Sequence, residues 1–305
     1  MELISPNINI DFVGKRFFFV VFSVAINLLS IVLLLTWGLN YGLDFSGGAM
    51  IEVRFAQPTT SAEVRQAVGS QDLEDLVIQD IGRNSTIFML RFKQHPGQNL
   101  NEISDAVKKA LTTAFGQSVE VLRIESVGSR VSGDLRRKGL LAVSFSTLLM
   151  GSYIALRFDL RFGLGAVIAL THDVLVVVGA LTLTQMPFDL SVLAALLTVV
   201  GYSVHDTIIV SDRVRENMRK LRRETLANVI NRSLNETLSR TIITSGTALL
   251  VLFALFLIGG HVIRPFAFTL IVGFITGTYS SIYIAAPVIL YFEKRFVRLR
   301  GSMRA

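Results

Sequence analysis

Six long apolar segments constrain the fold of this chain more than any other feature of its sequence. The first of them contains 21 residues without a charged side chain. About 20 apolar residues are enough to cross a bilayer as a helix, and a helix satisfies every backbone hydrogen bond where lipid offers none. The sequence therefore predicts an α-helical polytopic membrane protein with six spans, at residues 17–37, 139–156, 162–184, 190–211, 241–260 and 265–292.

The composition agrees with a membrane protein and excludes several kinds of site. Of the 305 residues, 51% are hydrophobic and 17% are charged, less charge than a soluble domain of this length carries. The sequence contains no cysteine, which excludes disulfides, thiolate metal sites and cysteine nucleophiles. It also lacks a P-loop, a nucleophile elbow and a zinc motif, so we expect no enzyme, cofactor or metal site.

Basic residues between the spans predict the orientation of the chain. Lys15 and Arg16 precede the first span, and further Lys and Arg occur in the loops and in the tail. Because cytoplasmic loops retain positive charge, both termini are expected in the cytoplasm, and the net charge of +7 requires no nucleic acid. The predicted parts are a cytoplasmic N-terminus (1–16), transmembrane helix 1 (17–39), an outer domain (40–138), five further helices (139–292) and a basic tail (293–305).

Residues 40–138 are predicted to form an extracytoplasmic α+β domain. Alternating apolar residues at 49–55, 77–81, 86–92 and 119–127 are typical of strands. Thr60 and Glu63 have the spacing of a capping box at the start of a helix at 60–68. A second helix at 99–115 ends before Gly116. The order β-α-β-β-α-β is that of the split βαβ, ferredoxin-like arrangement.

Asp206 in the fourth span is the ionisable residue that we interpret as functional. It lies about 7–8 Å from the middle of the span, where a charge is costly and usually faces the bundle interior or a water-filled path. A carboxylate whose environment changes can take up and release a proton. The alternative is a static carboxylate held by neighbouring hydroxyls. The adjacent His205 can tune Asp206 or shuttle protons itself, although a lone intramembrane histidine is more often a helix-packing partner.

Three further residues are candidates for the same proton-coupling site. Asp173 in the third span can extend a polar path, whereas its neighbour His172 can equally well make a helix contact, because adjacent residues point about 100° apart. Arg240, where a cytoplasmic loop meets the fifth span, can act only as a fixed cation, since arginine does not deprotonate. The alternative for Arg240 is an anchor that snorkels to the membrane interface.

Small residues mark two structural motifs. Gly47 and Gly48 follow Asp44 just outside the first span and predict a tight turn in which Asp44 accepts local hydrogen bonds. In the last span, a ridge of small residues lets another helix approach closely, within the bundle or from a partner subunit. Its members, at four-residue intervals, are Gly273, Gly277, Ser281 and Ala285.

Residues 212–240 form an amphipathic cytoplasmic loop in which apolar residues recur among basic ones. This pattern suits helices that lie on the inner membrane surface, near anionic lipid. The retention of positive charge on the cytoplasmic side explains the basic residues nearly as well.

Four stretches of the sequence stand out: Tyr41-Gly-Leu-Asp-Phe-Ser-Gly-Gly48, Ala169-Leu-Thr-His-Asp173, Gly201-Tyr-Ser-Val-His-Asp-Thr207 with the residues up to Asn217, and Ser239-Arg-Thr-Ile-Ile-Thr-Ser245. Together they closely resemble the SecD/SecF family of protein-export membrane proteins. Their order and spacing match from the first span to the last, and the outer domain is similar in length to that of SecF rather than to the larger one of SecD. The family usually has Asn immediately before the Asp of the fourth span, where this chain has His205.

The resemblance implies a six-span half of the resistance-nodulation-division (RND) architecture in the bacterial cytoplasmic (inner) membrane. It implies that such a chain, with a SecD-like subunit, uses the proton-motive force to assist translocation of unfolded preprotein beside the SecYEG channel and a YajC-like accessory protein. Protons and membrane lipids are then further partners, and Arg240 matches an arginine implicated in proton transport. Two alternatives stay open: a non-conducting assembly or scaffold subunit, and a small RND-type exporter of lipids or small molecules.

Overall fold

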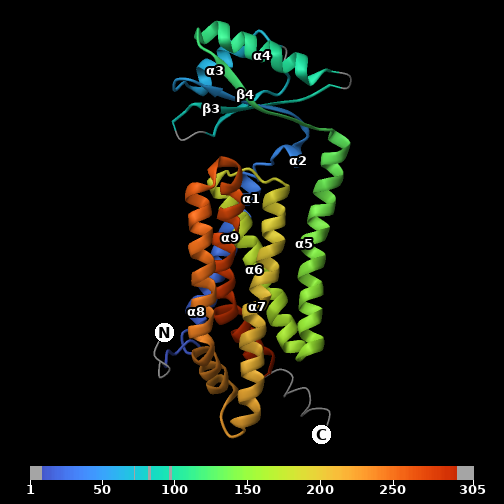
Figure 1. Cartoon of the computed structure of the whole chain (residues 1–305). Helices are drawn as coiled ribbons and strands as arrows, with labels where there is room; N and C mark the ends of the chain where they lie inside the picture. The colour runs from blue at the N-terminus through green and yellow to red at the C-terminus, as the bar shows by residue number, and fades with distance from the viewer. Residues whose placement is uncertain (1–8, 72, 82–83, 96–97, 294–305) are drawn as a thin grey trace. The chain divides into compact units, whose positions relative to one another are not determined.

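The computed structural model describes residues 9–71, 73–81, 84–95 and 98–293, and the chain divides into two compact units. One unit is Tyr41–Gly139, and the other combines the chain up to Asn40 with the chain from Leu140 onward. Figure 1 shows a sheet with helices in the first unit and a bundle of long helices in the second. Each unit has a hydrophobic core of its own.

The first unit is built on an antiparallel sheet that has four strands in the described residues, in the order β2-β3-β1-β4. The strands are β1 (Gly48–Phe55), β2 (Val77–Asp80), β3 (Ile87–Phe92) and β4 (Val119–Val127). Helices α3 (Ser61–Val68) and α4 (Leu100–Phe115) cover one face of the sheet (Figure 1). This order of elements is the ferredoxin-like arrangement, so the predicted fold of the domain is confirmed.

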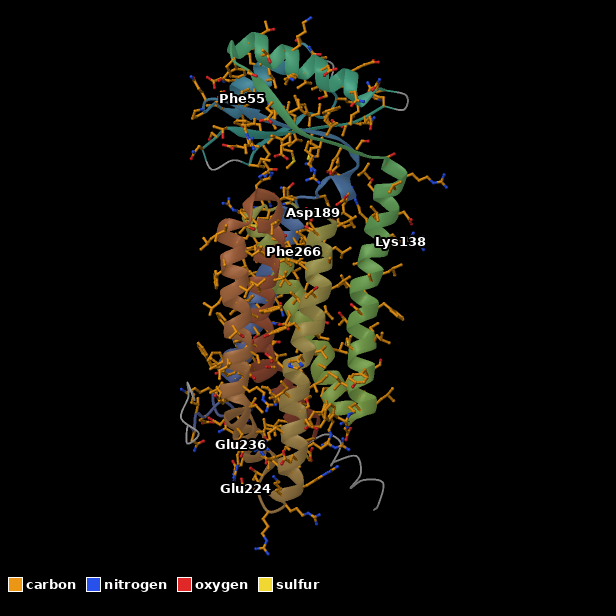
Figure 2. The ribbon with its side chains drawn as sticks, viewed as in Figure 1. Phe55, Lys138, Asp189, Glu224, Glu236 and Phe266 are labelled. Atoms are coloured by element: carbon orange, nitrogen blue, oxygen red, sulfur yellow. The ribbon has the colours of Figure 1, made fainter. Side chains whose placement is uncertain are left out.

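Local sequence explains where these two helices begin and end. The Glu63 N–H donates to the Thr60 hydroxyl at 3.3 Å, and the Thr60 N–H donates to Glu63 Oε2 at 2.9 Å, which completes the predicted capping box. Asn99 caps α4, and Gly116 ends it in the left-handed conformation with a φ of 61°. Phe55, labelled in Figure 2, lies in the core between the sheet and these helices and is 2% exposed.

Two consecutive glycines connect the short helix α2 (Leu43–Ser46) to β1. Gly47 and Gly48 have φ angles of 72° and 103°, which residues with a side chain rarely adopt. A Cβ atom on Gly48 would lie 2.5 Å from the carbonyl oxygen of Phe92. Asp44 lies in the first turn of α2. The glycines thus form a tight turn in which the backbone itself approaches the neighbouring strand.

Within the described residues, six helices are long and apolar enough to cross a membrane, as predicted. α5 begins at Ser129, ten residues before the predicted span, so a single helix leads from the first unit into the second. The six are α1 (Arg16–Thr36), α5 (Ser129–Arg157), α6 (Leu160–Thr184), α7 (Leu190–Lys220), α8 (Leu226–Ile258) and α9 (Gly260–Ser280), the last continuing through a π-helical segment, η1 (Ser281–Ala285), to Glu293.

The segment 212–240 differs from the predicted surface helices. α7 and α8 both continue beyond their apolar parts and form a helical hairpin with a short turn. In Figure 2, Glu224 and Glu236 lie at this end of the bundle, whereas Asp189 and Phe266 lie at the other. The apolar side chains of residues 212–240 pack between the two helices and against Phe12 and Val13. Each helix of the hairpin therefore covers the apolar face of the other, which we expected to lie against lipid. The buried residues there include Val214, Ile230 and Leu234.

α6, α7 and α9 form the centre of the bundle. About half of the apolar stretch of each is buried, against about a fifth or less for α1, α5 and α8. The small residues of the last span face this centre: a Cβ atom on Gly273 would come within 2.1 Å of Val199, and one on Gly277 within 3.0 Å of Ser203. Of the two roles left open for the ridge, its position therefore supports packing inside the bundle.

Candidate functional site

Asp173 of α6 joins three helices at the centre of the bundle, where it is 1% exposed. Its Oδ2 atom accepts hydrogen bonds from the Ser203 hydroxyl of α7 at 2.6 Å and from the Ser280 hydroxyl of α9 at 2.8 Å. Its Oδ1 atom lies 3.0 Å from Nδ1 of His172. Both carboxylate oxygens thus have partners, as buried polar groups in native proteins generally do.

His172 connects this carboxylate to the first helix. It is 4% exposed and stacks on Tyr279 of α9, with ring centroids 6.0 Å apart. The Tyr279 hydroxyl donates to the Phe19 carbonyl of α1 and lies 2.8 Å from the Ser23 hydroxyl. The Nε2 atom of His172 is buried without a hydrogen-bond partner in the part of the chain that the structure describes.

Asp206 of α7 is fully buried but only half paired. Its Oδ2 atom accepts a hydrogen bond from the Thr278 hydroxyl of α9 at 3.3 Å, whereas its Oδ1 atom has no partner among the described residues. Thr278 also lies 2.9 Å from the Ser245 hydroxyl of α8, to which Tyr202 donates at 3.1 Å. Because an unpaired buried charge is unfavourable, binding a proton at Asp206 would remove a charge that the surroundings only partly compensate.

The two carboxylates contact the same turn of the last span. The Thr278 hydroxyl donates to Asp206 and the Ser280 hydroxyl donates to Asp173, and η1 begins at Ser281, directly after Ser280. π-Helical segments are rare and are frequent at functional sites. The site residues predicted from the sequence include none of these hydroxyl partners, which are Ser203, Thr278 and Ser280. Ser203 had a usable signal, because it lies one helical turn before Asp206 on the same side of α7.

The hydrogen bonds described around the two carboxylates involve neither the His205 nor the Arg240 side chain. Both residues are exposed in the bundle, and no ion pair joins Arg240 to Asp206 within the described ranges. The Arg240 carbonyl accepts a hydrogen bond from the Thr244 hydroxyl at 3.0 Å, as a residue in a regular helix does. The structure therefore links Asp173, His172 and Asp206 through α9, and it leaves Arg240 separate from Asp206.

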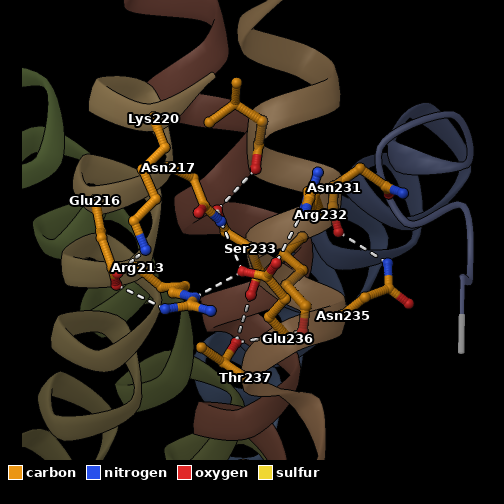
Figure 3. Close-up of polar contacts among 12 residues, drawn as sticks. Arg213, Glu216, Asn217, Lys220, Asn231, Arg232, Ser233, Asn235, Glu236 and Thr237 are labelled. Atoms are coloured by element: carbon orange, nitrogen blue, oxygen red, sulfur yellow. Dashed lines mark hydrogen bonds and ion pairs between the residues drawn. The ribbon is translucent and has the colours of Figure 1, made fainter. Parts of the chain in front are cut away.

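A polar network joins α7 and α8 beyond their apolar parts (Figure 3). Glu236 of α8 accepts hydrogen bonds from Arg213 at 2.6 Å, from Asn217 at 2.7 Å and from Arg232 at 3.0 Å. Asn217, which is 3% exposed, also donates to the Ser233 hydroxyl at 3.0 Å. We call this group the Glu236 network; it fixes how the two helices are rotated against one another.

A neighbouring side of α8 holds the N-terminal segment, residues 9–13, through an amide clamp formed by Asn231 and Asn235. Asn231 Oδ1 accepts from the Phe12 N–H at 2.8 Å, and Asn235 Oδ1 accepts from the Ile10 N–H at 2.8 Å. Both side chains return a hydrogen bond to the Ile10 carbonyl, at 3.1 and 2.9 Å. Residues 10–12 and the turn between α7 and α8 therefore lie at the same end of the bundle.

The described residues contain no group of three or more His, Asp or Glu side chains that could hold a metal ion. The buried carboxylates described above offer protonation and hydrogen bonding inside an apolar bundle.

Two descriptions of protein families match the chain. "Protein export membrane protein SecD/SecF, C-terminal" matches residues 106–295, the part that contains both buried carboxylates. "SecD/SecF GG Motif" matches residues 32–59, which include the turn at Gly47 and Gly48.

Similar proteins cover nearly the whole chain. Protein translocase subunit SecF of Desulfurispirillum indicum is 41% identical over 292 residues, which cover 94% of this chain and 93% of the relative. Protein translocase subunit SecF of Magnetococcus marinus is 45% identical over 296 residues, which cover 96% and 95%.

Solved structures of SecDF have the same fold. The crystal structure of SecDF, a translocon-associated membrane protein, from Thermus thermophilus is 32% identical with a TM-score of 0.86, and the match covers 96% of this chain and 40% of that one. SecDF in a super-membrane-facing form gives a TM-score of 0.72 at 32% identity, with coverage of 99% and 41%. The chain thus spans about two fifths of the length of these SecDF chains.

Proposed function

Since this chain belongs to the SecD/SecF family of protein export membrane proteins, we propose that it is a SecF-type subunit of the Sec protein-export machinery in the bacterial cytoplasmic membrane. The match to relatives over nearly their full length supports this assignment. The amide clamp places the N-terminal segment at the same end as the basic α7–α8 hairpin. Because positive charge stays in the cytoplasm, we assign this end to the cytoplasmic side.

We further propose that the proton-motive force drives the contribution of this subunit to export. The observation that carries the proposal is Asp206, a fully buried carboxylate inside the bundle, one oxygen of which has no partner among the residues that the structure describes. Ionisable groups at such depth are by default functional. One proton that moves through about 100 mV supplies about 2.3 kcal/mol, which is enough to change the balance between two conformations of a bundle.

In this mechanism Asp206 is the proton-bearing group and Arg240 its switching partner. When the Arg240 side chain approaches, the carboxylate is stabilised in its ionised form; when Arg240 is withdrawn, burial favours the protonated form. The exposed position of Arg240 corresponds to the withdrawn state. Alternation between the close and the withdrawn position of Arg240 requires movement of α8 relative to α7. In this proposal, that movement is coupled to export.

A SecD-like subunit is the partner that we propose for this chain. The chain matches about two fifths of a SecDF chain, and a SecD-like subunit would supply the remaining part of that architecture. The ridge of small residues on α9 and η1 packs against helices of the same bundle, so a SecD-like subunit would contact other faces of the bundle. α5 offers one, since several of its apolar side chains are largely exposed, among them Leu140, Phe145 and Leu156. A SecYEG channel, a YajC-like protein and unfolded preprotein complete the proposed assembly.

The test compares parent and Asp206→Asn in vesicles that contain each form, with its partners, at equal abundance. The asparagine keeps shape and hydrogen bonding but cannot ionise, so gradient-dependent stimulation of translocation should be lost while insertion is normal. Asp206→Glu should retain part of the stimulation. The matched control is Asp212→Asn, since Asp212 is an exposed residue of the same helix.

Two other outcomes of this test would each indicate a different function. If Asp206→Asn stimulates export as the parent does, the proton-coupled role is wrong and a scaffold subunit is favoured. Flux of a lipid or small molecule that depends on Asp206 and needs no preprotein would instead indicate a small RND-type exporter.

A further inference from the structure

The π-helical segment η1 has an identifiable cause in the sequence. Proline lacks a backbone N–H and its ring collides with the carbonyl four residues earlier. Pro287 therefore cannot form an α-helical bond to Tyr283, which lies in the middle of η1 (Ser281–Ala285). A widened turn lets the helix continue past this missing bond, and such local adjustments accompany prolines within helices.

η1 begins at the point where the last span contacts both buried carboxylates. The Thr278 hydroxyl donates to Asp206 and the Ser280 hydroxyl to Asp173. At its other end, η1 packs closely on α6: a Cβ atom on Gly165 would lie 3.1 Å from the Ala285 carbonyl oxygen. Both hydroxyls therefore belong to residues within three positions of Ser281, the first residue of the widened turn.

Ser280 has a second acceptor that Ser203 lacks. Its hydroxyl lies 2.8 Å from Asp173 Oδ2 and 3.2 Å from the Gly277 carbonyl oxygen, but it has one proton to donate. Within the described residues, the Ser203 hydroxyl donates to Asp173 alone. Gly277 is also the residue whose carbonyl accepts from the Ser281 N–H, the last α-helical bond before η1.

Protonation of Asp173 at Oδ2, the oxygen that does not face His172, changes which of the two acceptors the Ser280 hydroxyl binds. As a carboxylate, Asp173 Oδ2 accepts from both serine hydroxyls. Once a proton is bound to Oδ2, this atom becomes a donor and needs an acceptor, and Ser280 can supply it by turning its own proton to the Gly277 carbonyl. The hydrogen bonding at the α/π junction then differs between the two protonation states.

We propose that η1 is the switch element of the last span, and that Ser280 and Thr278 are positioning residues that connect its conformation to protonation of Asp173 and Asp206. Conversion of the widened turn to α-helix turns the following residues by about 100° and shifts them by about 1.5 Å for each residue absorbed. The helix from Ala286 to Glu293 would then move relative to α6. This inference rests on the proposed proton-coupled function.

The first test compares two serines that bind the same oxygen. Ser280→Ala and Ser203→Ala each remove one short hydrogen bond to Asp173 Oδ2, so a purely structural role predicts equal losses of gradient-dependent export. We expect Ser280→Ala to lose about tenfold, the scale of one charged hydrogen bond, and Ser203→Ala to lose clearly less. Thr278→Val should resemble Ser280→Ala. Thr276→Val is its control, because the Thr276 hydroxyl bonds to carbonyls of its own helix.

The second test follows the helix itself and needs no export. The chain has no cysteine, so Val288→Cys gives a single thiol just beyond Pro287. Val288 lines a cavity of about 340 Å³ between α1, α6 and the last span. We expect Asp173→Asn, which mimics the protonated state, to change the labelling rate of this thiol by a small polar reagent at least threefold. Val20→Cys on α1, which lines the same cavity, should be unaffected.

Two further variants make this result decisive. Pro287→Ala permits a regular helix, and in that background Asp173→Asn should no longer change the labelling of Val288→Cys. If Pro287→Ala does not fold, Ser280→Ala serves the same purpose. An unchanged rate in Asp173→Asn, or an effect that persists in both backgrounds, overturns the proposal. Labelling does not depend on export, so this failure is distinct from failure of the proposed function.

Discussion

Arg213 of α7 donates to Glu236 of α8 at 2.6 Å, seven residues after Asp206 on one helix and four before Arg240 on the other. This ion pair therefore connects the two helices that carry the proposed proton-bearing group and its switching partner. In Figure 3, the pair stands within the wider Glu236 network, in which one carboxylate receives three donors. Any rotation of α8 that brings Arg240 toward Asp206 must also change this network.

Glu236→Gln should therefore loosen the α7–α8 hairpin. Its side chain is 26% exposed and that of Arg213 is 36% exposed, so we expect a loss of about 1 kcal/mol, as for partly exposed ion pairs. The measurement is thermal unfolding in detergent at low and high salt, with a difference that shrinks as salt screens the pair. The control is Lys220→Gln, because the Lys220 side chain is 63% exposed. Equal losses in the two variants would contradict the network.

Arg240→Lys should impair gradient-dependent export even though it keeps a positive charge at neutral pH. Lysine loses the planar fork of arginine and can deprotonate when it enters an apolar site, so it cannot serve as a permanent cation beside Asp206. Vesicle translocation with and without a proton gradient measures the effect. Arg219→Lys, at an exposed position of α7, is the control. Full activity of Arg240→Lys would show that charge alone suffices, or that Arg240 only anchors α8.

Gly273→Ala should destabilise the bundle by about 1–3 kcal/mol, the usual cost of overpacking a close contact. The added methyl group would lie 2.1 Å from Val199, so α7 and α9 must separate. Gly201→Ala is the matched control: its methyl group meets nothing within 4 Å, and alanine favours helix by about 1 kcal/mol over glycine. Thermal unfolding in detergent should lower the midpoint for the first variant and not for the second. The opposite order would exclude the close packing of these helices.

The capping box of α3 should make the start of this helix sensitive to acid. Hydrogen bonds from the backbone N–H and the hydroxyl of Thr60 and from the hydroxyl of Thr59 hold the pKa of Glu63 below its ordinary value. A lowered pKa in the folded state contributes stability above the ordinary pKa, and this stability is lost as pH falls through the lowered one. Hydrogen exchange of α3 amides in the intact chain, corrected for intrinsic rates, should therefore show loss of protection at low pH.

Glu63→Gln is the control for this effect. Glutamine can complete a capping box but does not titrate, so protection of α3 should be nearly independent of pH. The same pH profile in the parent and in this variant would mean that Glu63 does not stabilise the helix through its charge.

Sequence patterns predicted those parts of the fold that short-range interactions determine. The capping residues Thr60 and Glu63 and the terminal Gly116 belong to the helix that they delimit, so the ferredoxin-like order could be derived from the chain alone. The spans followed from hydropathy for the same reason. By contrast, the pairing of Ser280 with Asp173 joins residues 107 positions apart, and nothing near Ser280 in the sequence indicates its partner.

The segment 212–240 illustrates a different limit. An amphipathic pattern shows that one face of a helix is covered, but it does not identify the cover. Val214 and Leu234 have the same pattern whether lipid or a second helix lies against them, and the structure places them in one core. Pro287 in the last span is a signal for an irregular helix, which the prediction of an uninterrupted span at 265–292 did not include.

The amide clamp has a consequence for the order in which the protein is made. Ile10 and Asn235 are separated by 225 positions. At synthesis rates of about 5–20 residues per second, the N-terminal segment waits about 10–45 seconds before its asparagine partners exist. The clamp therefore cannot guide insertion of the first span. We expect Lys15 and Arg16 to orient that span during synthesis, and the clamp to hold the segment in place afterwards.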